Sequence, residues 1–172
     1  MIQRPATPDD APALSRLATD SFVAAFGHLY SKEDLQAFLD EYRSVERYRA
    51  DIASPVKRVQ LAEVDGRLAA YCLIVFGHHF EERPEPRPAR PVFISQLYCL
   101  PEMTGHGLGA ALMDWAIAEA RGWGADALQL SVFSENVGAQ RFYHRYGFRH
   151  VADIDFWVGN HRDDEFLYEL AL

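Results

Sequence analysis

The sequence of 172 residues has few cysteines, few lysines and no long apolar run. No apolar stretch approaches the ~20 residues that a membrane-spanning helix requires, so we expect no membrane association. The first five residues lack the apolar core of a signal peptide. The only cysteines, Cys72 and Cys99, show neither a CxxC pattern nor a zinc-ligand spacing, which argues against a disulfide framework or a metal site. The two could approach each other on neighbouring strands, but reduced thiols in a cytoplasmic protein are the simpler interpretation.

Positive charge is also scarce. Seventeen Lys and Arg residues against 25 Asp and Glu give a net charge of −8. This balance argues against nucleic acid as the main partner, because phosphate backbones are bound by basic surfaces. It is compatible with a small cationic substrate that the field of the protein attracts, although solubility is the plainer explanation of the charge. The length suits a single domain over residues 1–172 with one core.

Hydrophobic spacing and turn residues predict an α/β order of elements. Apolar residues at helical spacing, with caps such as Thr7 and Ser31, indicate helices, and apolar runs bounded by turns indicate strands. Asp65-Gly66 predicts a β-hairpin, and the segment 78–91, with four prolines, predicts a loop or mobile flap. Strands that alternate with helices in the second half imply parallel pairing there. We expect helices over 7–27, 31–42, 45–52, 107–121 and 136–146, and strands over 2–4, 59–64, 68–76, 92–100, 127–133, 148–158 and 165–172.

A glycine-rich turn between a strand and a helix is the sharpest local feature. Gly105, Gly107 and Gly109 stand at every second position and leave no Cβ to keep a ligand from the backbone. The first amides of the following helix lack internal partners and carry the positive end of its dipole, which suits a pyrophosphate. An ordinary strand-to-helix turn is the plainer alternative. A dinucleotide-binding fold would fit GxGxxA at Ala110, but only about sixty residues follow and they look antiparallel. The turn has no lysine, which excludes a P-loop.

A second group of residues follows the next strand. Asn136 is a good helix cap, and Tyr143 lies two turns further along the same helical face. If the strands before the two helices are neighbours and splay apart, a thin cofactor arm could lie between them, with Asn136 and Tyr143 on one side of it. The plainer alternatives are that Asn136 only caps the helix and that Tyr143 packs in the core beside Phe142.

Together the two motifs resemble those of the GNAT superfamily of acyl-CoA-dependent N-acyltransferases. The superfamily's Gln/Arg-x-x-Gly-x-Gly/Ala motif maps onto 104–109, and its later Asn, Phe-Tyr and Gly-Phe positions map onto Asn136, 142–143 and 147–148. The resemblance implies a mixed, mostly antiparallel sheet of about seven strands with helices on both faces and splayed strands before the cofactor helices. One departure is Thr104, where Gln or Arg is usual. Because that residue often contributes its backbone amide, we expect weakened rather than absent cofactor binding.

The resemblance implies acetyl-CoA as cofactor, coenzyme A as product and direct attack of a neutral amine on the thioester. Tyr143 would be catalytic, giving a proton to the departing thiolate. An amide near Cys99, freed where the strand is interrupted at Leu100-Pro101, would polarise the carbonyl. The residues implied in cofactor binding are Leu97, Tyr98, Cys99, Thr104, Gly105, His106, Gly107, Leu108, Gly109, Ala110, Asn136, Ala139 and Tyr143.

The acceptor side resembles the PaiA-type polyamine (spermidine/spermine) N-acetyltransferases. The resemblance lies in 21–26, 31–35, the region of Tyr42, 155–159 and Glu165, and it implies a primary amine acceptor, either a polyamine or another small cationic amine. Positions where relatives carry a catalytic carboxylate hold Ser131, Ser95 and Gln96. We therefore expect no dedicated carboxylate base, and instead a water chain that ends at Asp155, Glu135 or a histidine. The candidate substrate residues are Tyr30, Gln96, Ser131 and Asp155.

Two other functions remain open at this stage. A non-catalytic acyl-CoA-binding sensor would fit Thr104 and the missing carboxylate, whereas the presence of Tyr143 speaks against it. Acetylation of protein α-amines or lysines would fit an open acidic groove rather than a pocket closed by the proline-rich flap. A homodimer is common for such folds, but no feature of this sequence requires one.

Overall fold

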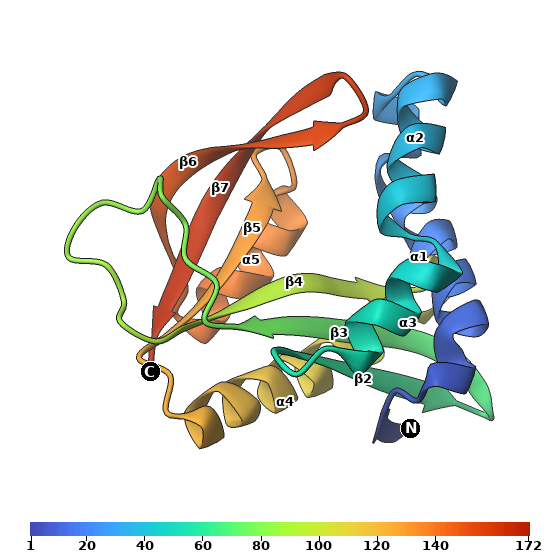
Figure 1. The fold of residues 1–172 in the computed structure, drawn as a ribbon, viewed down its shortest axis with the longest axis horizontal. Coiled ribbons are helices and arrows are strands. Elements are labelled where there is room, and N and C mark those ends of the chain that lie inside the picture. Colours follow the sequence, from blue (N-terminus) through green and yellow to red (C-terminus); the bar gives the residue numbers. More distant parts are fainter.

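The structure, a computed structural model of residues 1–172, is built on one seven-stranded sheet in the order β1-β2-β3-β4-β5-β7-β6 (Figure 1). Its strands are β1 (Ile2–Pro5), β2 (Lys57–Val64), β3 (Arg67–Phe76), β4 (Pro91–Cys99), β5 (Ala127–Phe133), β6 (Arg149–Val158) and β7 (His161–Ala171). Its helices are α1 (Ala11–Phe26), α2 (Lys32–Tyr42), α3 (Val45–Ala53), α4 (Leu108–Trp123) and α5 (Val137–Tyr146), with short 3-10 turns η1 (Pro8–Asp10), η2 (Gly27–Leu29) and η3 (Pro101–Met103).

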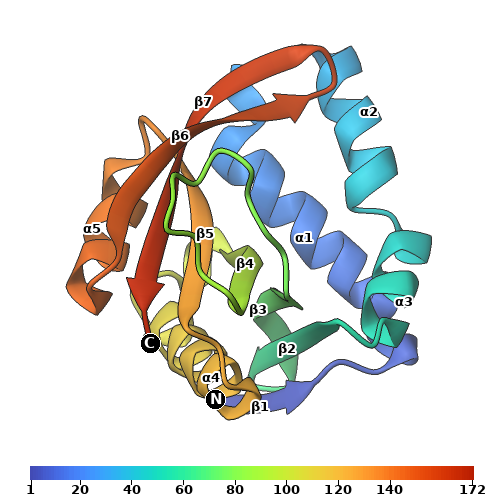
Figure 2. The ribbon, with the colours of Figure 1, turned by 60° about the vertical axis from the view of Figure 1, so that its left-hand side comes forward.

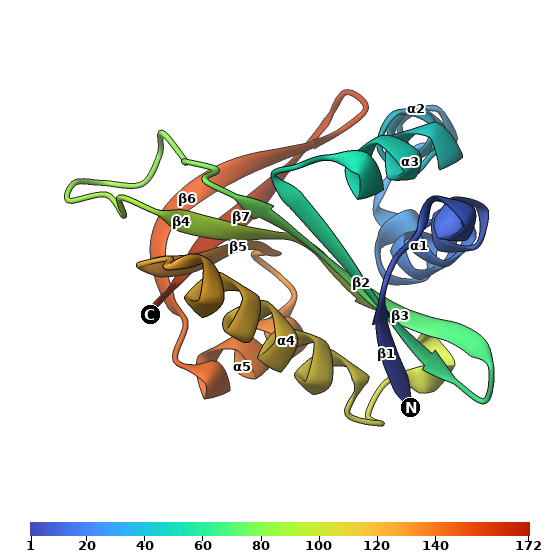
Figure 3. The same cartoon turned by 60° about the horizontal axis from the view of Figure 1, so that its bottom comes forward.

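Helices cover both faces of the sheet. Figure 3 shows α4 and α5 on one face and α1 and α3 on the other, with α2 at the far end beside the β6–β7 hairpin. A core of 17 buried residues lies on the α4 side, and one of nine lies on the α1–α3 side. A third, small core of Phe22, Phe38 and Val158 joins α1, α2 and β6. Because each face of the sheet buries apolar residues, each needs a covering layer, and the predicted layered α/β fold is confirmed.

Several predicted local signals act as expected. Asp65 and Gly66 both have positive φ, 51° and 75°, and close the β2–β3 hairpin. Ser31 accepts a hydrogen bond from the amide of Asp34 at 3.1 Å and so caps α2. The first helix differs in detail, because the residues after Thr7 form the 3-10 turn η1 before α1 begins at Ala11. None of the helices is long and apolar enough to cross a membrane.

The last strand begins earlier than predicted. A tight turn at Gly159-Asn160 closes the β6–β7 hairpin at once, so β7 starts at His161 rather than at Glu165. Asp163 and Glu165 therefore lie within a strand of the sheet, two positions apart and on the same face. Asn160 donates its amide hydrogen to Asp34 Oδ1 at 2.8 Å, which joins the hairpin tip to α2.

The strands β4 and β5 form the one parallel pair of the sheet, and they pair over only half of their length. Their last partners are Ile94 and Leu130, whereas β4 continues to Cys99 and β5 to Phe133. A bulge in the β3–β4 pairing leaves Ser95 without a partner just where the separation begins. The predicted splaying of the strands before the two later helices is thus confirmed.

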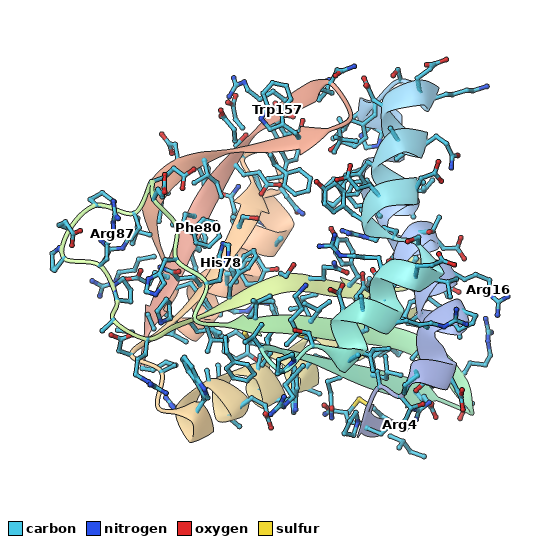
Figure 4. All side chains as sticks on the ribbon, viewed as in Figure 1. Arg4, Arg16, His78, Phe80, Arg87 and Trp157 are labelled. Carbon is cyan, nitrogen blue, oxygen red and sulfur yellow. The ribbon has the colours of Figure 1, made fainter.

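The proline-rich segment 77–90 is a loop tied to the sheet. Arg83 donates two hydrogen bonds of 2.9 Å to the carboxylate of Glu169, and Asp126 accepts from the amides of Ala89 and Arg90. Figure 2 shows the loop in front of the sheet, and Figure 4 shows Arg87 at its outer end and His78 and Phe80 nearer the strands. Phe80 packs edge-on against Phe93 of β4.

Candidate active site

The turn before α4 presents a run of unused backbone donors. Between Gly105 and Ala110 no amide hydrogen bonds to any acceptor in the protein; the first helical bond of this turn runs from Ala111 to the carbonyl of Gly107. Gly105 and Gly107 have φ of 79° and 81°, a left-handed conformation that glycine adopts without strain. A Cβ at either glycine would meet no protein atom within 4 Å, so the space in front of the amides is open. Such a cluster of donors at a helix N-terminus can bind phosphate oxygens.

Three other residues of this turn were expected to bind the cofactor, and the structure shows what each has free for it. Thr104 donates both its amide and its hydroxyl hydrogen to the carbonyl of Pro101, at 3.2 and 2.8 Å, so its amide is not available to a ligand. Leu108 is 2% exposed and packs in the core, which leaves only its amide for binding. His106 is exposed and lies 3.0 Å from the carbonyl of Thr104 through Nδ1.

A cavity of about 420 Å³ occupies the separation between β4 and β5. The amide of Leu100 donates to Ala69 of β3, so strand alternation turns the amides of Leu97 and Cys99 the other way, toward the separation. A smaller cavity of about 180 Å³ lies against α4 and α5 and is lined by Gly109 and Phe142. The residues that line both cavities are Leu97, Tyr98, Cys99, Ala139 and Tyr143. A narrow chain could therefore run from the glycine turn through the sheet into the larger cavity.

Tyr143 and Asn136 reach this passage from α5. The Tyr143 hydroxyl has no hydrogen-bond partner in the protein, although its ring is packed edge-on against Phe142 and Phe148. Burial raises the pKa of the Tyr143 phenol well above its usual value, so the group keeps its proton at neutral pH. Asn136 caps α5 by accepting from the amide of Ala139 at 3.1 Å, and its side-chain Nδ2 has no partner within the protein.

Glu165, which the sequence analysis did not propose as a base or substrate residue, places a carboxylate in the larger cavity. Burial is the main cause that raises the pKa of Glu165 to about 7, against a smaller opposing effect of a hydrogen bond with Ser131. Its Oε2 atom is buried and has no hydrogen-bond partner. A carboxyl group that titrates near neutral pH in a cavity can accept and release a proton under physiological conditions. The sequence analysis expected no dedicated carboxylate base, whereas the structure places a carboxylate in the cavity.

The predicted alternative bases lie elsewhere. Asp155 is absent from the cavity lining; it is exposed on β6 and pairs with Arg162 at 2.6 Å. The reason is the alternation of side chains along β6: Phe156 lines the cavity, so Asp155 lies on the opposite face of the strand, paired with Asp164. Glu135 is exposed after β5 and does not line the cavity either.

The other predicted substrate residues do line the cavity. Tyr30 donates a hydrogen bond of 2.5 Å to Asp163 Oδ2, and burial raises the pKa of the phenol well above its usual value. Ser131 lies on β5, lines the cavity and hydrogen-bonds with Glu165. Gln96 is 8% exposed, and its Oε1 accepts from the hydroxyls of Tyr48 and Tyr71 at 2.7 and 2.8 Å.

Arg43, at the end of α2, is a second lining residue that the sequence analysis missed. It is 6% exposed, and its guanidinium lies over the rings of Phe38 and Phe22, 4.9 and 5.4 Å from their centroids. Its Nη1 donates to the carbonyl of Tyr42 at 3.1 Å, while Nε is buried without a partner. The chain has 17 Lys and Arg residues, and in the sequence nothing distinguishes Arg43 from the others. Only the packing of α2 on α1 turns it inward.

Known proteins share both this fold and this sequence pattern. The sequence profile of the acetyltransferase (GNAT) family matches residues 13–148. An uncharacterized N-acetyltransferase of Mycobacterium tuberculosis is 31% identical over 92% of this chain and 95% of its own. The aminoalkylphosphonate N-acetyltransferase of Salmonella typhimurium is 30% identical over 76% of this chain and 79% of its own. In fold, the chain is similar to the PaiA N-acetyltransferase of Thermoplasma acidophilum, solved in complex with coenzyme A, with a TM-score of 0.78 and 19% identity over 99% of this chain and 98% of that one.

Proposed function

The chain belongs to the acetyltransferase (GNAT) family, and from this premise we propose that it transfers the acetyl group of acetyl-CoA to the primary amine of a small molecule. The observation that carries the proposal is the cavity between β4 and β5. It is lined by Tyr143, whose hydroxyl has no partner in the protein, and by the carboxylate of Glu165. Transfer of an acetyl group from a thioester to an amine is promoted by an acid for the leaving sulfur and a base for the amine, and both line this cavity. The name of the Salmonella relative describes an amine acceptor of small size, which supports the same class of reaction.

The residues around the split fit coenzyme A. The free amides from Gly105 to Ala110 would hold the pyrophosphate, because they converge at the positive end of α4. The amide of Leu97, together with Asn136 Nδ2, would hold the amide groups of the pantetheine arm. When bound, acetyl-CoA supplies an acetyl group activated as a thioester.

The acceptor amine must lose a proton before it can attack, and Glu165 would take it. A pKa of about 7 lets this carboxylate be ionised in a large fraction of molecules at neutral pH while it remains a useful base. The N–C bond forms as the C–S bond breaks. Two protons leave the ammonium nitrogen: Glu165 carries one, and the other replaces the proton that Tyr143 gives to sulfur. The amide of Cys99 would stabilise the negative charge on the carbonyl oxygen.

The acceptor would bind on the side of Glu165, between α1, η2 and β7. Asp163 and Glu165 supply negative charge there, and Tyr30 extends the polar wall through its bond to Asp163. These groups suit an ammonium ion, which supports the small cationic amines predicted from the sequence, including polyamines.

Replacing Tyr143 with Phe is the experiment that tests the reaction. We expect kcat to fall about 10- to 100-fold, less than for the loss of many general acids, because a thiolate with a reference pKa near 8.5 leaves without much help. Release of free thiol from acetyl-CoA should be followed with spermidine, small amines, amino acids and short peptides as acceptors. The dissociation constant of coenzyme A should change little, since the phenol has no role in holding the phosphates.

A non-catalytic sensor is the competing function, and the same assay separates the two. If no acceptor produces thiol while acetyl-CoA still raises the melting temperature of the protein, the transfer function is refuted and the sensor is favoured. If the Tyr143→Phe variant turns over as fast as the original chain, the role of Tyr143 as acid is wrong even though the transfer stands.

Arg83 tests whether the loop 77–90 acts as a lid over the acceptor. The loop contributes no residue to the lining of the cavity, so Arg83→Ala should leave kcat/KM unchanged for every acceptor. The same change removes a largely buried two-bond contact with Glu169 and should lower the free energy of unfolding by about 1–3 kcal/mol. Urea denaturation and the thiol-release assay measure the two effects. A marked loss of activity with intact stability would show that the loop closes the site after all.

A further inference from the structure

We propose that the acceptor is a small zwitterionic amine, whose oxyanion (a carboxylate or phosphonate) binds to Arg43 while its amine faces Glu165. This inference rests on the proposed transfer reaction and narrows its substrate class. It starts from the charges that line the cavity: negative charge at Asp163 and Glu165, and a buried positive charge at Arg43.

The hydrogen-bond donors of Arg43 are largely unused. Its Nη1 donates to the carbonyl of Tyr42, Nε is buried without any partner, and the only side chain that hydrogen-bonds with the guanidinium is the uncharged hydroxyl of Tyr98. No carboxylate forms an ion pair with it; the titratable groups that act on it most are the phenols of Tyr71, Tyr48 and Tyr98. A buried charge without a counter-ion is costly unless something else compensates it.

Packing alone does not explain an arginine at this position. The ring centroid of Phe22 lies 4.6 Å from that of Phe38 and 6.4 Å from that of Tyr98. An apolar side chain would pack against these three rings as well as Arg43 does. Cation–π contacts with these rings recover part of the desolvation cost, but they supply no anionic acceptor for the N–H groups at the guanidinium edge, where Nε has no partner at all. That edge is the part of arginine that binds carboxylates and phosphonates with two parallel hydrogen bonds.

The neighbours of Arg43 in the cavity add donors rather than acceptors. Tyr48 and Tyr71 both donate to Oε1 of Gln96, which fixes the orientation of the amide. The Nε2 group of Gln96 has no acceptor in the protein and is therefore a free donor of a residue that lines the cavity. The Tyr98 hydroxyl lies beside the guanidinium and accepts a hydrogen bond from it, which leaves its own hydrogen free to donate. An oxyanion would find three kinds of donor here, whereas a second ammonium group would meet a like charge.

A polyamine therefore fits one end of the cavity and not the other. Its first ammonium would be stabilised by Asp163 and Glu165, but any ammonium that extends to the α2 side would approach Arg43. A zwitterion satisfies both ends at once. This places the substrate among amino acids and amino-alkylphosphonates in charge type, with a single amine and a single anionic group.

The experiment compares acceptors that differ in the anionic group alone. β-Alanine and aminoethylphosphonate carry it, propylamine lacks it, and spermidine replaces it with further cations. We expect kcat/KM for one of the two zwitterions to exceed that for propylamine and for spermidine by about 10- to 100-fold. Arg43→Met should lower kcat/KM for that zwitterion at least tenfold more than for propylamine, and Arg43→Lys should recover part of the difference because it restores the charge.

Each outcome bears on a different claim. If both zwitterions are poorer acceptors than propylamine, or if Arg43→Met lowers all acceptors by the same factor, the anion site is refuted and Arg43 is a packing residue. If spermidine is the best acceptor, the polyamine assignment replaces ours. If no amine releases thiol, the transfer function itself fails, which the sensor test above detects separately. Circular dichroism and coenzyme A affinity of both variants establish that the fold is retained.

Discussion

Replacing Glu165 with Gln is expected to lower kcat/KM for the amine acceptor by about 10²- to 10⁴-fold, the usual contribution of a general base. Gln keeps the size and the hydrogen bonding of the side chain but cannot accept the proton of the ammonium group. Asp164→Asn is the matched control, since Asp164 directly precedes Glu165 in β7 and its side chain is 71% exposed on the opposite face. This control should retain full activity in the thiol-release assay.

The pH dependence gives an independent test of the same role. The base must be ionised, and the pKa of Glu165 is about 7, so kcat/KM should rise with pH through 7 and then level off. In the Glu165→Gln variant the residual activity should lose this limb. A profile that keeps its limb near pH 7 in the variant would assign the titration to another group, and the carboxylate would then not be the base.

The contribution of Glu165 to the free energy of unfolding should fall over the pH range in which kcat/KM rises. The pKa of Glu165 is raised from 4.5 to about 7 on folding, chiefly by burial, so the folded state binds more protons than the unfolded state between these values. The contribution of Glu165 to stability therefore falls as pH rises from 4.5 through 7. Glu165→Gln removes this cost and should be more stable by about 1–3 kcal/mol at pH 8, with little difference near pH 4.5. Urea denaturation at the two pH values measures this, and a variant that is less stable at pH 8 would indicate a structural carboxylate.

The cofactor side could be predicted from the sequence because its signals are local. Three alternating glycines before a helix, a capping Asn136 and a tyrosine two turns later define positions within single elements. The structure then needed only the neighbouring positions of β4 and β5 to bring them together. Thr104 is the exception on the cofactor side. Its amide donates to the carbonyl of Pro101 in η3, and a sequence motif does not reveal that this donor is already used.

The acceptor side could not be predicted in the same way, because it is assembled from distant segments. Glu165 enters the cavity because the turn at Gly159 closes early and brings β7 into register with β5. Its neighbours Asp163, Asp164 and Glu169 are equally acidic, so composition alone does not single it out. Arg43 turns inward because α2 packs on α1 through Phe38 and Phe22, a contact that no spacing within α2 reveals.

Gly159→Ala is expected to disrupt the acceptor side without touching it. A Cβ at this position would lie 2.5 Å from Oδ1 and 2.6 Å from Cα of Asp34, so the hairpin tip must move away from α2. The hydrogen bond between Asn160 and Asp34 would be lost with it. Because the backbone of Asp34 lies inside α2 and cannot yield, we expect the free energy of unfolding to fall by about 2–4 kcal/mol, the sum of left-handed backbone strain and overpacking.

The hairpin carries Asp163 and Glu165, so its displacement should also raise KM for the acceptor at least tenfold, while the affinity for coenzyme A is retained at the distant glycine turn. Gly66→Ala is the matched control: Gly66 has a similar φ of 75° in the β2–β3 turn, and a Cβ there meets nothing within 4 Å. This control should cost only the strain of about 1–2 kcal/mol and leave KM unchanged. Equal losses in the two variants would mean that the contact with α2 adds nothing, and the acceptor pocket would then not depend on the seating of the hairpin against that helix.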